Sequence, residues 1–456
     1  MRKNSKIHPS PLHILSPGQM MVAGFGFLIL LGAVLLTSPL SSANGTSTSF
    51  IDALFTATSA VCVTGLVVVD TSIHWSIFGK VVIILLIQVG GLGFMTLGTL
   101  VALIFGKKIN LRQRILIKEA LNQDELSGSV KLIKKVLKYT MVIEGMGALI
   151  LSFAFIPQFG FLKGIGYSIF TSISSFCNAG FDLMGSISGE YSSIVSYYNR
   201  PLIVFTISAL IILGGIGFPV IINIVNKRHL KKLSLNSKMA LVTTAILIVG
   251  GFLMIFLGEA GHALHGMTLW EKFQVAFFQS VTTRTAGYAT IDLTQFREST
   301  LFVMIILMFI GASPASTGGG IKTTTAAVLF IAVKSFIKNE NEITVQHKRI
   351  NVFTFRKALG IFMIAISIAV LGVYLLSITQ DPKHFDILSC SFEVSSALAT
   401  VGLSLAGSYH LNSVGKVIIM VLMFTGRVGS LTIFTAFISE NKRMRVRYPE
   451  AKVLVG

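Results

Sequence analysis

The sequence predicts an all-α membrane protein made of four tandem repeats, each with a membrane span, a short helix followed by a loop, and a second span. Three observations lead to this fold class. The chain of 456 residues is 53% hydrophobic and only 12% charged, with a mean hydropathy of +0.77, which excludes an ordinary soluble domain. Eight apolar runs are long enough to cross a hydrocarbon core of about 30 Å. Four shorter apolar segments alternate with them in a regular order.

The eight predicted spans lie at 20–40, 76–105, 136–156, 201–225, 238–257, 300–334, 354–378 and 414–438. The first follows three basic residues and has the composition of a signal peptide. We interpret it as a retained helix, because the other three repeats keep their first span. The predicted repeats are 20–106, 136–226, 238–335 and 354–438, and the connecting and terminal segments are 1–19, 107–135, 227–237, 336–353 and 439–456.

The four short segments share one frame of residues. Each has a Phe ten residues before a glycine and a large apolar or aromatic residue after it; the glycines are Gly65, Gly180, Gly287 and Gly402. Successive glycines are therefore 115, 107 and 115 residues apart. A shared frame at so long a period indicates a fourfold internal repeat.

Each short segment has the length of a half-membrane helix. The first runs from Asp52 to about Val61, or ~15 Å of helix. Asp52, Glu271 and Asp386 fit the first turn, where the helix dipole stabilises a carboxylate. Irregular backbone at membrane depth is tolerated only where protein or water covers it, so the four loops are expected to meet on one axis. Helix C-termini and loop carbonyls would there favour a cation, which predicts a pseudo-fourfold cation pore with one selectivity filter.

The distribution of charge predicts the topology. Of the 38 Lys and Arg residues, 28 lie on the side of the N-terminus, seven on the opposite side and three in membrane segments. This positive-inside pattern places both termini in the cytoplasm of a multi-pass protein of the plasma membrane. The net charge of +19 is explained by these loops, so no nucleic-acid partner is expected. The basic inner face is suited to a regulatory partner or to anionic lipid.

The third repeat has an interrupted second span. Residues 311–325 contain Pro314, three consecutive glycines and Lys322, which predicts an unwound loop beside a water-filled cavity. The glycines in the first two second spans, around Gly90 and Gly214, are interpreted as sites of close helix packing.

Taken together, these motifs resemble the Trk/Ktr/HKT superfamily of potassium transporters, and most closely its bacterial Ktr-type membrane subunits of the KtrB kind. The resemblance rests on four tetrapeptides around the glycines and covers nearly the whole chain. It implies a selectivity filter made of Val63, Thr64, Gly65, Asn178, Ala179, Gly180, Thr285, Ala286, Gly287, Thr400, Val401 and Gly402. Sodium-preferring plant members carry a serine in place of the first glycine, so Gly65 implies a preference for potassium.

The resemblance also implies a gate below the filter. The gate residues would be Ala312, Ser313, Pro314, Ala315, Ser316, Thr317, Gly318, Gly319, Gly320, Lys322 and Arg427. It further implies a homodimer and a cytosolic nucleotide-binding regulatory ring of the KtrA or KtrC kind. K⁺ would be the transported ion and Na⁺, for some members, an activator. No cofactor and no resident metal are expected in this chain.

Several alternatives stay open at this point. Arg427 either forms part of the gate or makes a structural salt bridge with Glu144 or Glu393. Arg284 is expected to point behind the filter and to brace the third loop, with Glu393 as a possible partner. The rival functions are a sodium-selective or non-selective cation pathway and a polytopic membrane enzyme. An enzyme would need a cluster of His, Asp or Glu at membrane depth, which the sequence does not offer.

Overall fold

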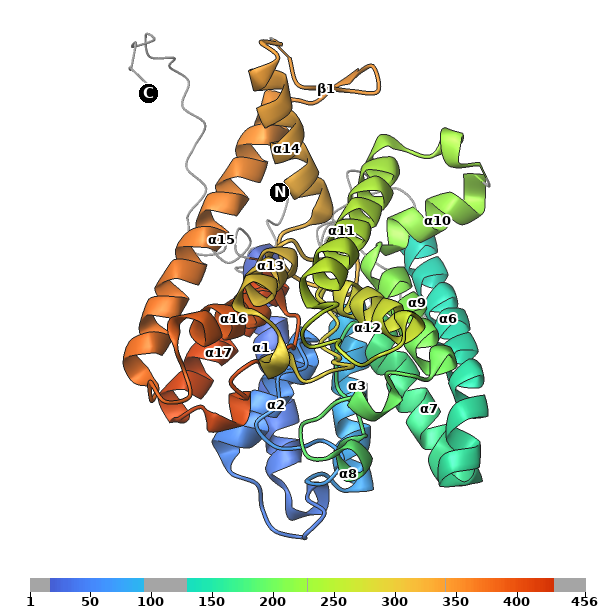
Figure 1. Ribbon diagram of the computed structural model, residues 1–456, viewed down its shortest axis with the longest axis vertical. Helices are drawn as coiled ribbons and strands as arrows, with labels where there is room; N and C mark the ends of the chain where they lie inside the picture. The colour runs from blue at the N-terminus through green and yellow to red at the C-terminus, as the bar shows by residue number, and fades with distance from the viewer. Residues whose placement is uncertain (1–16, 94–128, 228, 341, 430–456) are drawn as a thin grey trace, which may run out of the picture.

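The structure is a computed structural model that describes residues 17–93, 129–227, 229–340 and 342–429. This part of the chain is almost entirely helical (Figure 1). Its one regular sheet is an antiparallel pair of two-residue strands, β1 (Thr344–Val345) and β2 (Lys348–Arg349). The helical character of the predicted fold class is therefore confirmed.

The helices form four consecutive groups. The first group contains α1 (Pro17–Thr37), α2 (Phe50–Cys62) and α3 (Ile77–Leu92). The second contains α6 (Ser129–Phe159), α7 (Phe161–Phe176), α8 (Gly185–Ser188), α9 (Pro201–Gly215) and α10 (Phe218–Lys227). The third contains α11 (Leu235–Glu259), α12 (Leu269–Thr282), α13 (Glu298–Phe309) and α14 (Thr323–Ile337), and the fourth α15 (Val352–Thr379), α16 (Ile387–Ala399) and α17 (Ser413–Val428). Short 3₁₀ turns are η2 (Pro39–Ser41), η3 (Val195–Tyr197), η4 (Leu230–Lys232), η5 (Leu293–Gln295) and η6 (Ser408–His410).

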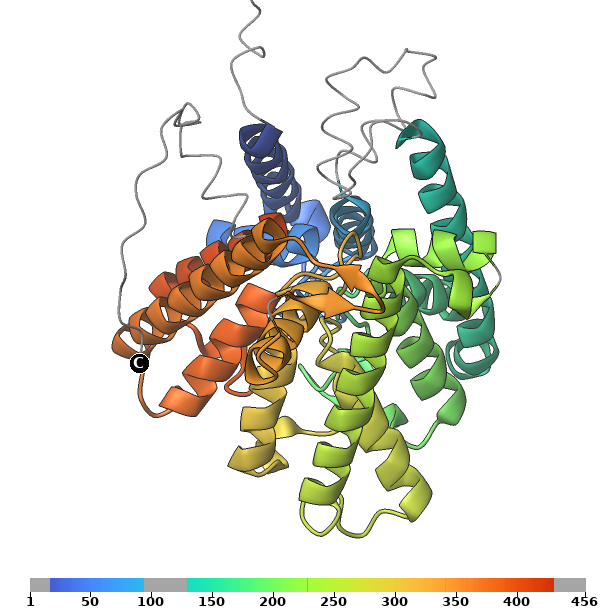
Figure 2. The same ribbon diagram turned by 90° about the horizontal axis from the view of Figure 1, so that it is seen from above.

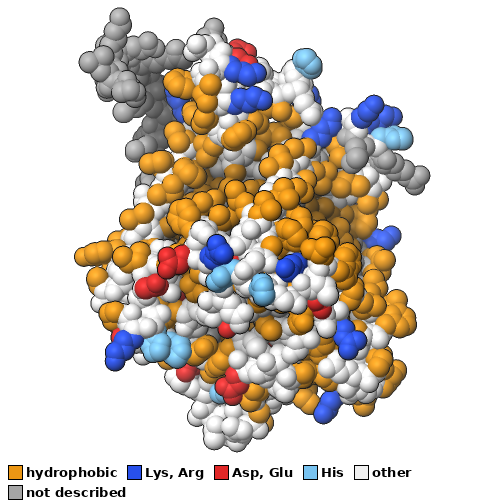
Figure 3. Space-filling model, in the orientation of Figure 1, with side chains coloured by type: hydrophobic (Ala, Val, Ile, Leu, Met, Phe, Trp, Pro, Cys, Tyr) orange, Lys and Arg blue, Asp and Glu red, His pale blue; other side chains and the backbone are white. Residues whose placement is uncertain are grey.

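The first helix of each group is long and apolar enough to cross a membrane. The segments that meet this criterion are Gly18–Thr37, Lys131–Phe159, Leu235–Glu259 and Val352–Thr379. Their outward faces carry exposed apolar side chains, such as Leu257 on α11 and Val370 on α15. Hydrophobic side chains cover much of one face of the molecule (Figure 3). A continuous apolar surface of this kind suits lipid rather than water.

The predicted second spans are not continuous helices. The run 201–225 is broken between α9 and α10, which meet at a bend of 95° around Gly217. The run 300–334 is broken from residue 310 to residue 322, between α13 and α14. In the other two, α3 ends at Leu92 and α17 at Val428, and the remainder of the predicted spans lies outside the described residues. The prediction of eight spans is thus not confirmed, and the run 201–225 forms two helices at an angle rather than one continuous helix.

Gly90 on α3 and Gly214 on α9 lie against the C-terminal ends of the short helices α2 and α7. A Cβ added to Gly90 would lie 2.0 Å from the carbonyl oxygen of Val61, and one added to Gly214 would lie 1.9 Å from that of Phe176. Only a residue without a side chain permits this approach. The close-packing interpretation of both glycines is confirmed, whereas the helix break that follows Gly215 was not predicted.

The short helices α2, α7, α12 and α16 begin as the sequence suggests. Asp52 and Glu271 lie in the first turns of α2 and α12, and Asp386 caps α16 by accepting a hydrogen bond from the Ser389 backbone. Thr268 and Glu271 form a capping box. The backbone N–H and the hydroxyl of Thr268 hold the pKa of the Glu271 carboxyl below its usual range.

The four groups pack in a closed cycle. The α3 helix packs on α7, α9 on α12, α13 on α16, and α17 on α2, so a later helix of each group contacts the short helix of the next. The last of these contacts includes an ion pair of 2.6 Å between Lys416 and Asp52. Figure 2 shows the groups, in their successive colours, arranged around a common centre. This cycle brings the loops that follow the short helices together.

Candidate functional site

The four loops that follow α2, α7, α12 and α16, which we call loops 1 to 4, share an unusual backbone conformation. The residue two before each loop glycine has a positive φ, which is 58° at Val63, 59° at Asn178, 69° at Thr285 and 52° at Thr400. Three of these residues are β-branched, for which the left-handed region is a genuine outlier. Such strain costs roughly 1–3 kcal/mol per residue and persists mainly at functional sites.

The four loop glycines form a closed ring. A Cβ added to Gly65 would lie 2.4 Å from the Ala179 carbonyl oxygen and 3.1 Å from the Cα of Gly180. The same relation leads from Gly180 to Ala286 and Gly287, from Gly287 to Val401 and Gly402, and from Gly402 to Thr64 and Gly65. We call Gly65, Gly180, Gly287 and Gly402 the glycine ring. All four also have positive φ, so a side chain at any of them would be both strained and obstructed.

The ring places carbonyl oxygens next to one another at the ends of four helices. The oxygens of Thr64, Ala179, Ala286 and Val401 each lie beside the neighbouring loop's glycine. The helices α2, α7, α12 and α16 direct their C-terminal ends, which carry partial negative charge, at these loops. Carbonyl oxygens in this arrangement can replace the hydration shell of a cation. Among the described residues no group of three or more His, Cys, Asp or Glu side chains could hold a metal ion.

Hydroxyl groups of the short helices support the loops in two different ways. In loops 1 and 4, the hydroxyls of Ser59 and Ser396 accept hydrogen bonds of 3.1 and 3.0 Å from the N–H of Gly65 and Gly402. In loops 2 and 3, the hydroxyls of Ser174 and Thr282 instead donate to carbonyl oxygens just after the glycine, both at 2.7 Å. The Tyr288 hydroxyl donates to Phe181 at 3.1 Å and joins loop 3 to loop 2.

The segment 310–322 between α13 and α14, which we call the α13–α14 loop, contacts three of the four ring loops. The Thr317 hydroxyl lies 3.1 Å from the Asn178 amide oxygen, and the Gly319 N–H donates to the Thr400 hydroxyl at 3.1 Å. A Cβ added to Gly318 would lie 2.0 Å from the Thr285 hydroxyl. The predicted unwound region thus exists, although α14 already begins at Thr323.

The α13–α14 loop is also held by the broken second helix of the second group. The N–H groups of Ser313 and Thr317 donate to Gly215 and Gly214, at 2.9 and 3.3 Å. The N–H of Phe218, at the start of α10, donates to Ala315 at 3.0 Å. The carbonyl and N–H groups freed by the bend between α9 and α10 therefore pair with the loop.

Two basic side chains donate hydrogen bonds to carbonyls of the α13–α14 loop. Arg427 lies on α17, and Lys322 belongs to the loop itself. Arg427 donates from Nη1 to Thr317, and from Nη2 to Gly90 and, at 3.0 Å, to Gly91 at the end of α3. Lys322 donates to Gly318 at 2.7 Å and to Gly319 at 3.5 Å. The segment predicted to form the gate, Lys322 included, is thus bound to Arg427 and lies against the ring loops.

The salt-bridge alternatives for the two arginines are wrong in the described part of the chain. Glu393 accepts hydrogen bonds from Ser404, Ser408 and the Leu405 N–H, all in the segment that follows loop 4. Glu144 accepts from the Gln88 amide at 3.2 Å and from the Cys177 thiol at 3.8 Å. Neither acid pairs with Arg284 or Arg427 among the described ion pairs.

Arg284, three residues before Gly287, binds a backbone carbonyl instead of an acid. Its Nη2 donates to the Gly311 carbonyl at 3.1 Å, near the start of the α13–α14 loop. Its Nη1 has no hydrogen-bond partner in the described residues, although the side chain is 6% exposed. This contact joins Arg284 to the α13–α14 loop through a carbonyl in place of an acid, and the bracing of the third loop stays a prediction.

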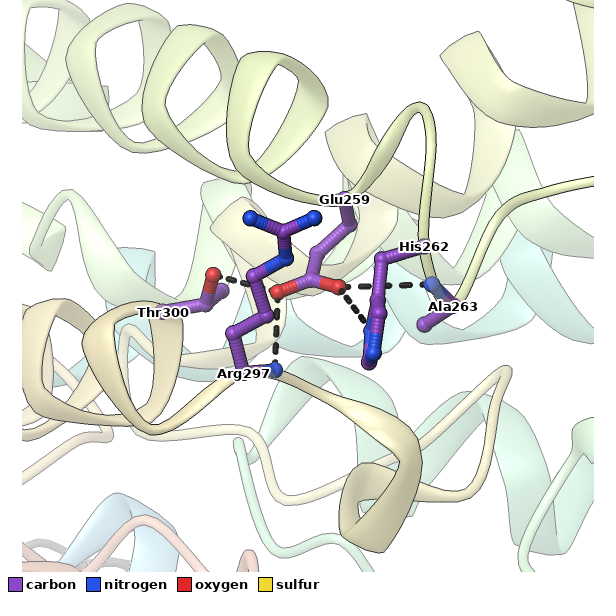
Figure 4. Close-up of polar contacts among 5 residues, drawn as sticks. All are labelled: Glu259, His262, Ala263, Arg297 and Thr300. Carbon is purple, nitrogen blue, oxygen red and sulfur yellow. Dashed lines mark hydrogen bonds and ion pairs between the residues drawn. The ribbon is translucent and has the colours of Figure 1, made fainter.

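A buried acid that the sequence analysis did not single out joins α11 to α13. Glu259, the last residue of α11, is fully buried and accepts from the Thr300 hydroxyl, from the Arg297 N–H at 3.0 Å and from the Ala263 N–H at 3.4 Å (Figure 4). His262 Nδ1 lies 3.3 Å from its carboxylate. Because Arg297 is 38 residues away in sequence, no local pattern could have indicated this joint.

Comparison with known proteins gives a consistent result. The family described as "TrkH: Cation transport protein" matches residues 19–446. The chain is 43% identical, over 97% of its length and 98% of the relative's, to the potassium/sodium uptake protein NtpJ of Enterococcus hirae. It is 40% identical to the Ktr system potassium uptake protein B of Bacillus subtilis, over 97% of both chains.

The fold matches a solved structure as well. The crystal structure of the potassium transporter TrkH from Vibrio parahaemolyticus superposes with a TM-score of 0.74 at 17% identity, covering 94% of this chain and 87% of that one. The relatives are named as cation transporters, so the enzyme alternative is not supported. By its sequence this chain belongs to the TrkH family of cation transport proteins.

Proposed function

We propose that this chain is the ion-translocating membrane subunit of a potassium uptake system and conducts K⁺ inward through the glycine ring. The observation that carries the proposal is the ring itself, in which four loops present neighbouring carbonyl oxygens at four helix ends. Carbonyl dipoles and helix C-termini favour a cation without needing any charged side chain in its path. The filter would consist of the twelve residues from Val63 to Gly65, Asn178 to Gly180, Thr285 to Gly287 and Thr400 to Gly402.

The proposed architecture is four repeats around this pore. The cyclic packing of each group's later helix on the next group's short helix supports a pseudo-fourfold arrangement. Each repeat would consist of a first span, a short pore helix and a second span, which in the second and third repeats is interrupted, between α9 and α10 and between α13 and α14. Both termini would then lie in the cytoplasm of a cell-membrane protein, in keeping with the excess of Lys and Arg on that side.

The α13–α14 loop is the proposed gate. Its contacts with Asn178, Thr285 and Thr400 place it directly against the ring loops, where it would obstruct an ion. Arg427 and Lys322 bind its carbonyls and add positive charge beside the path. A conducting state would require these contacts to break.

The proposed assembly is a homodimer that binds a separate cytosolic nucleotide-binding ring, with Na⁺ as an activator. This part rests on the likeness to Ktr-type proteins and on the basic loops that such a ring would meet. No nucleotide or other cofactor is assigned to the chain itself.

The test is ion uptake by the purified chain in lipid vesicles, measured separately for Rb⁺, as a substitute for K⁺, and for Na⁺. The proposal predicts Rb⁺ uptake in excess of Na⁺ uptake. Gly65→Ser should lower the Rb⁺ to Na⁺ ratio, because a hydroxymethyl group would lie against the Ala179 carbonyl. Equal uptake of both ions by the unaltered chain would favour the non-selective alternative, and Na⁺ uptake alone would favour the sodium-selective one. The name of the Enterococcus relative includes both ions, which makes the Na⁺ measurement essential.

A further inference from the structure

The side chain of Asn178 connects three separate segments of the chain. Its Nδ2 donates to the Arg284 carbonyl at 3.2 Å and to the Thr285 hydroxyl at 3.3 Å, both in loop 3. Its Oδ1 accepts from the Thr317 hydroxyl of the α13–α14 loop at 3.1 Å. The residue itself belongs to loop 2 and is fully buried. One amide group therefore joins two ring loops and the loop beneath them.

The orientation of this amide is fixed by chemistry. The Arg284 carbonyl can only accept a hydrogen bond, so the NH₂ group of Asn178 must face it. The amide oxygen is then left to face the Thr317 hydroxyl, which can donate. The reverse orientation would place the Asn178 amide oxygen against the Arg284 carbonyl oxygen, and both are acceptors. A single orientation of the amide therefore allows the hydrogen bonds to both loop 3 and the α13–α14 loop.

Thr317 is bound on all of its polar groups, each by a different part of the fold. Its hydroxyl lies 3.1 Å from both the Asn178 amide oxygen and the Phe176 carbonyl at the end of α7. Its N–H donates to Gly214 on α9, and its carbonyl accepts from Arg427 on α17. Thr317 is thus one point at which the α13–α14 loop is bound to several other parts of the molecule.

The other ring loops indicate that the amide is not required for the turn. The same position is occupied by Val63, Thr285 and Thr400, with φ between 52° and 69°. Val63 adopts this conformation with no polar side chain at all. The amide of Asn178 is therefore available for contacts beyond its own loop.

We propose that Asn178 is a positioning residue that couples the glycine ring to the α13–α14 loop. Its amide holds the α13–α14 loop against the glycine ring and fixes loop 2 against loop 3. Movement of the α13–α14 loop away from the ring would therefore also free one side of the ring. This inference rests on the proposed function of the loop as the gate. It assigns the Asn178 side chain to coupling, whereas the loop carbonyls face the ion.

The test compares Asn178→Val with the unaltered chain in lipid vesicles, without any partner protein. Loss of one buried hydrogen bond to the loop should raise basal Rb⁺ flux by roughly fivefold. The Rb⁺ to Na⁺ ratio should fall as well, because the tie between loops 2 and 3 is lost. A merely structural defect would lower the flux rather than raise it. The matched control is Ser168→Ala. It removes a buried hydrogen bond within α7, from Ser168 to Gly164, away from the α13–α14 loop, and should change neither the basal Rb⁺ flux nor the Rb⁺ to Na⁺ ratio.

A second variant keeps the proposal testable if Asn178→Val does not fold. Thr317→Val removes the same tie from the side of the α13–α14 loop and should raise basal flux by a similar factor. The rise in flux of the double variant should be smaller than the product of the two single rises, because the contact between the two side chains can be lost only once. Unchanged flux in both single variants, or effects that multiply in the double variant, would overturn the coupling role. Absence of any Rb⁺ flux in the unaltered chain would instead contradict the proposed function.

Discussion

Two arginines, the buried Arg284 and the partly buried Arg427, both bind backbone carbonyls but with different numbers of partners. Both donate to backbone carbonyls, and neither pairs with an acid in the described part of the chain. Arg427 reaches Thr317, Gly90 and Gly91, so it joins the α13–α14 loop to the end of α3. Within the described residues, the guanidinium of Arg284 reaches only Gly311.

The difference between them shows how backbone carbonyls accommodate an arginine beside the proposed cation path. The carbonyls at the C-terminal end of α3 carry partial negative charge, which favours a guanidinium there without a carboxylate. An acid at the same place would attract the transported cation, whereas carbonyls compensate Arg427 and leave a net positive charge next to the loop. Arg284 has fewer such partners, and its contact serves to fix where the loop begins.

The largest expected effect comes from removing Arg427. Arg427→Gln loses a charge and three carbonyl contacts, and charge-assisted hydrogen bonds contribute about 1.5–3 kcal/mol each. The α13–α14 loop should then be held less firmly against the glycine ring, and basal Rb⁺ flux into vesicles should rise tenfold or more. Arg427→Lys retains the charge and should give a smaller rise. A flux that falls in Arg427→Gln while the protein remains folded would show that Arg427 promotes conduction instead of opposing it.

A smaller effect is expected for Arg284. Arg284→Met loses one carbonyl contact of about 1.5–3 kcal/mol, and part of this loss is offset because the cost of burying the charge is removed, so basal flux should rise by about tenfold at most. The thermal unfolding temperature should fall little, because the variant also removes the cost of burying a charge that has no acid partner. The measurement is vesicle flux together with thermal unfolding in detergent. An Arg284→Met effect larger than that of Arg427→Gln would reverse the comparison.

The smallest expected effect is an absence of coupling between Arg284 and Glu393. Because Glu393 binds Ser404, Ser408 and the Leu405 N–H, it is already satisfied without Arg284. The changes in unfolding free energy of Glu393→Gln and Arg284→Met should therefore add within about 0.3–0.5 kcal/mol in the double variant. A larger interaction energy would indicate that the two side chains form an ion pair after all.

Much of the fold was predictable because its signals are local. The apolar runs of α1, α6, α11 and α15 and the acidic first turns of α2 and α12 are read directly from consecutive residues. The loop glycines were predictable from their repeated spacing, and the structure adds their positive φ and their mutual contact. The unwound α13–α14 loop followed from its proline and glycines.

The contacts that organise the site were not predictable because they join distant residues. Asn178 and Thr317 are separated by 139 residues, and Arg427 and Gly90 by 337. No periodicity relates such pairs, so the acid partners proposed for the arginines were chosen by charge alone and were wrong. The bend of 95° between α9 and α10 was missed because the apolar composition of the run was weighed above its local helix breakers, Gly217 and Pro219.

The central claim is that a cation binds at the glycine ring, and heavy-atom crystallography tests it most directly. Crystals of the full chain grown in Rb⁺ should show anomalous density on the axis of the ring, within reach of the carbonyl oxygens of Thr64, Ala179, Ala286 and Val401. Crystals of Gly65→Ser should show weaker density at that position. Rb⁺ density elsewhere in the protein with none at the ring would contradict the account.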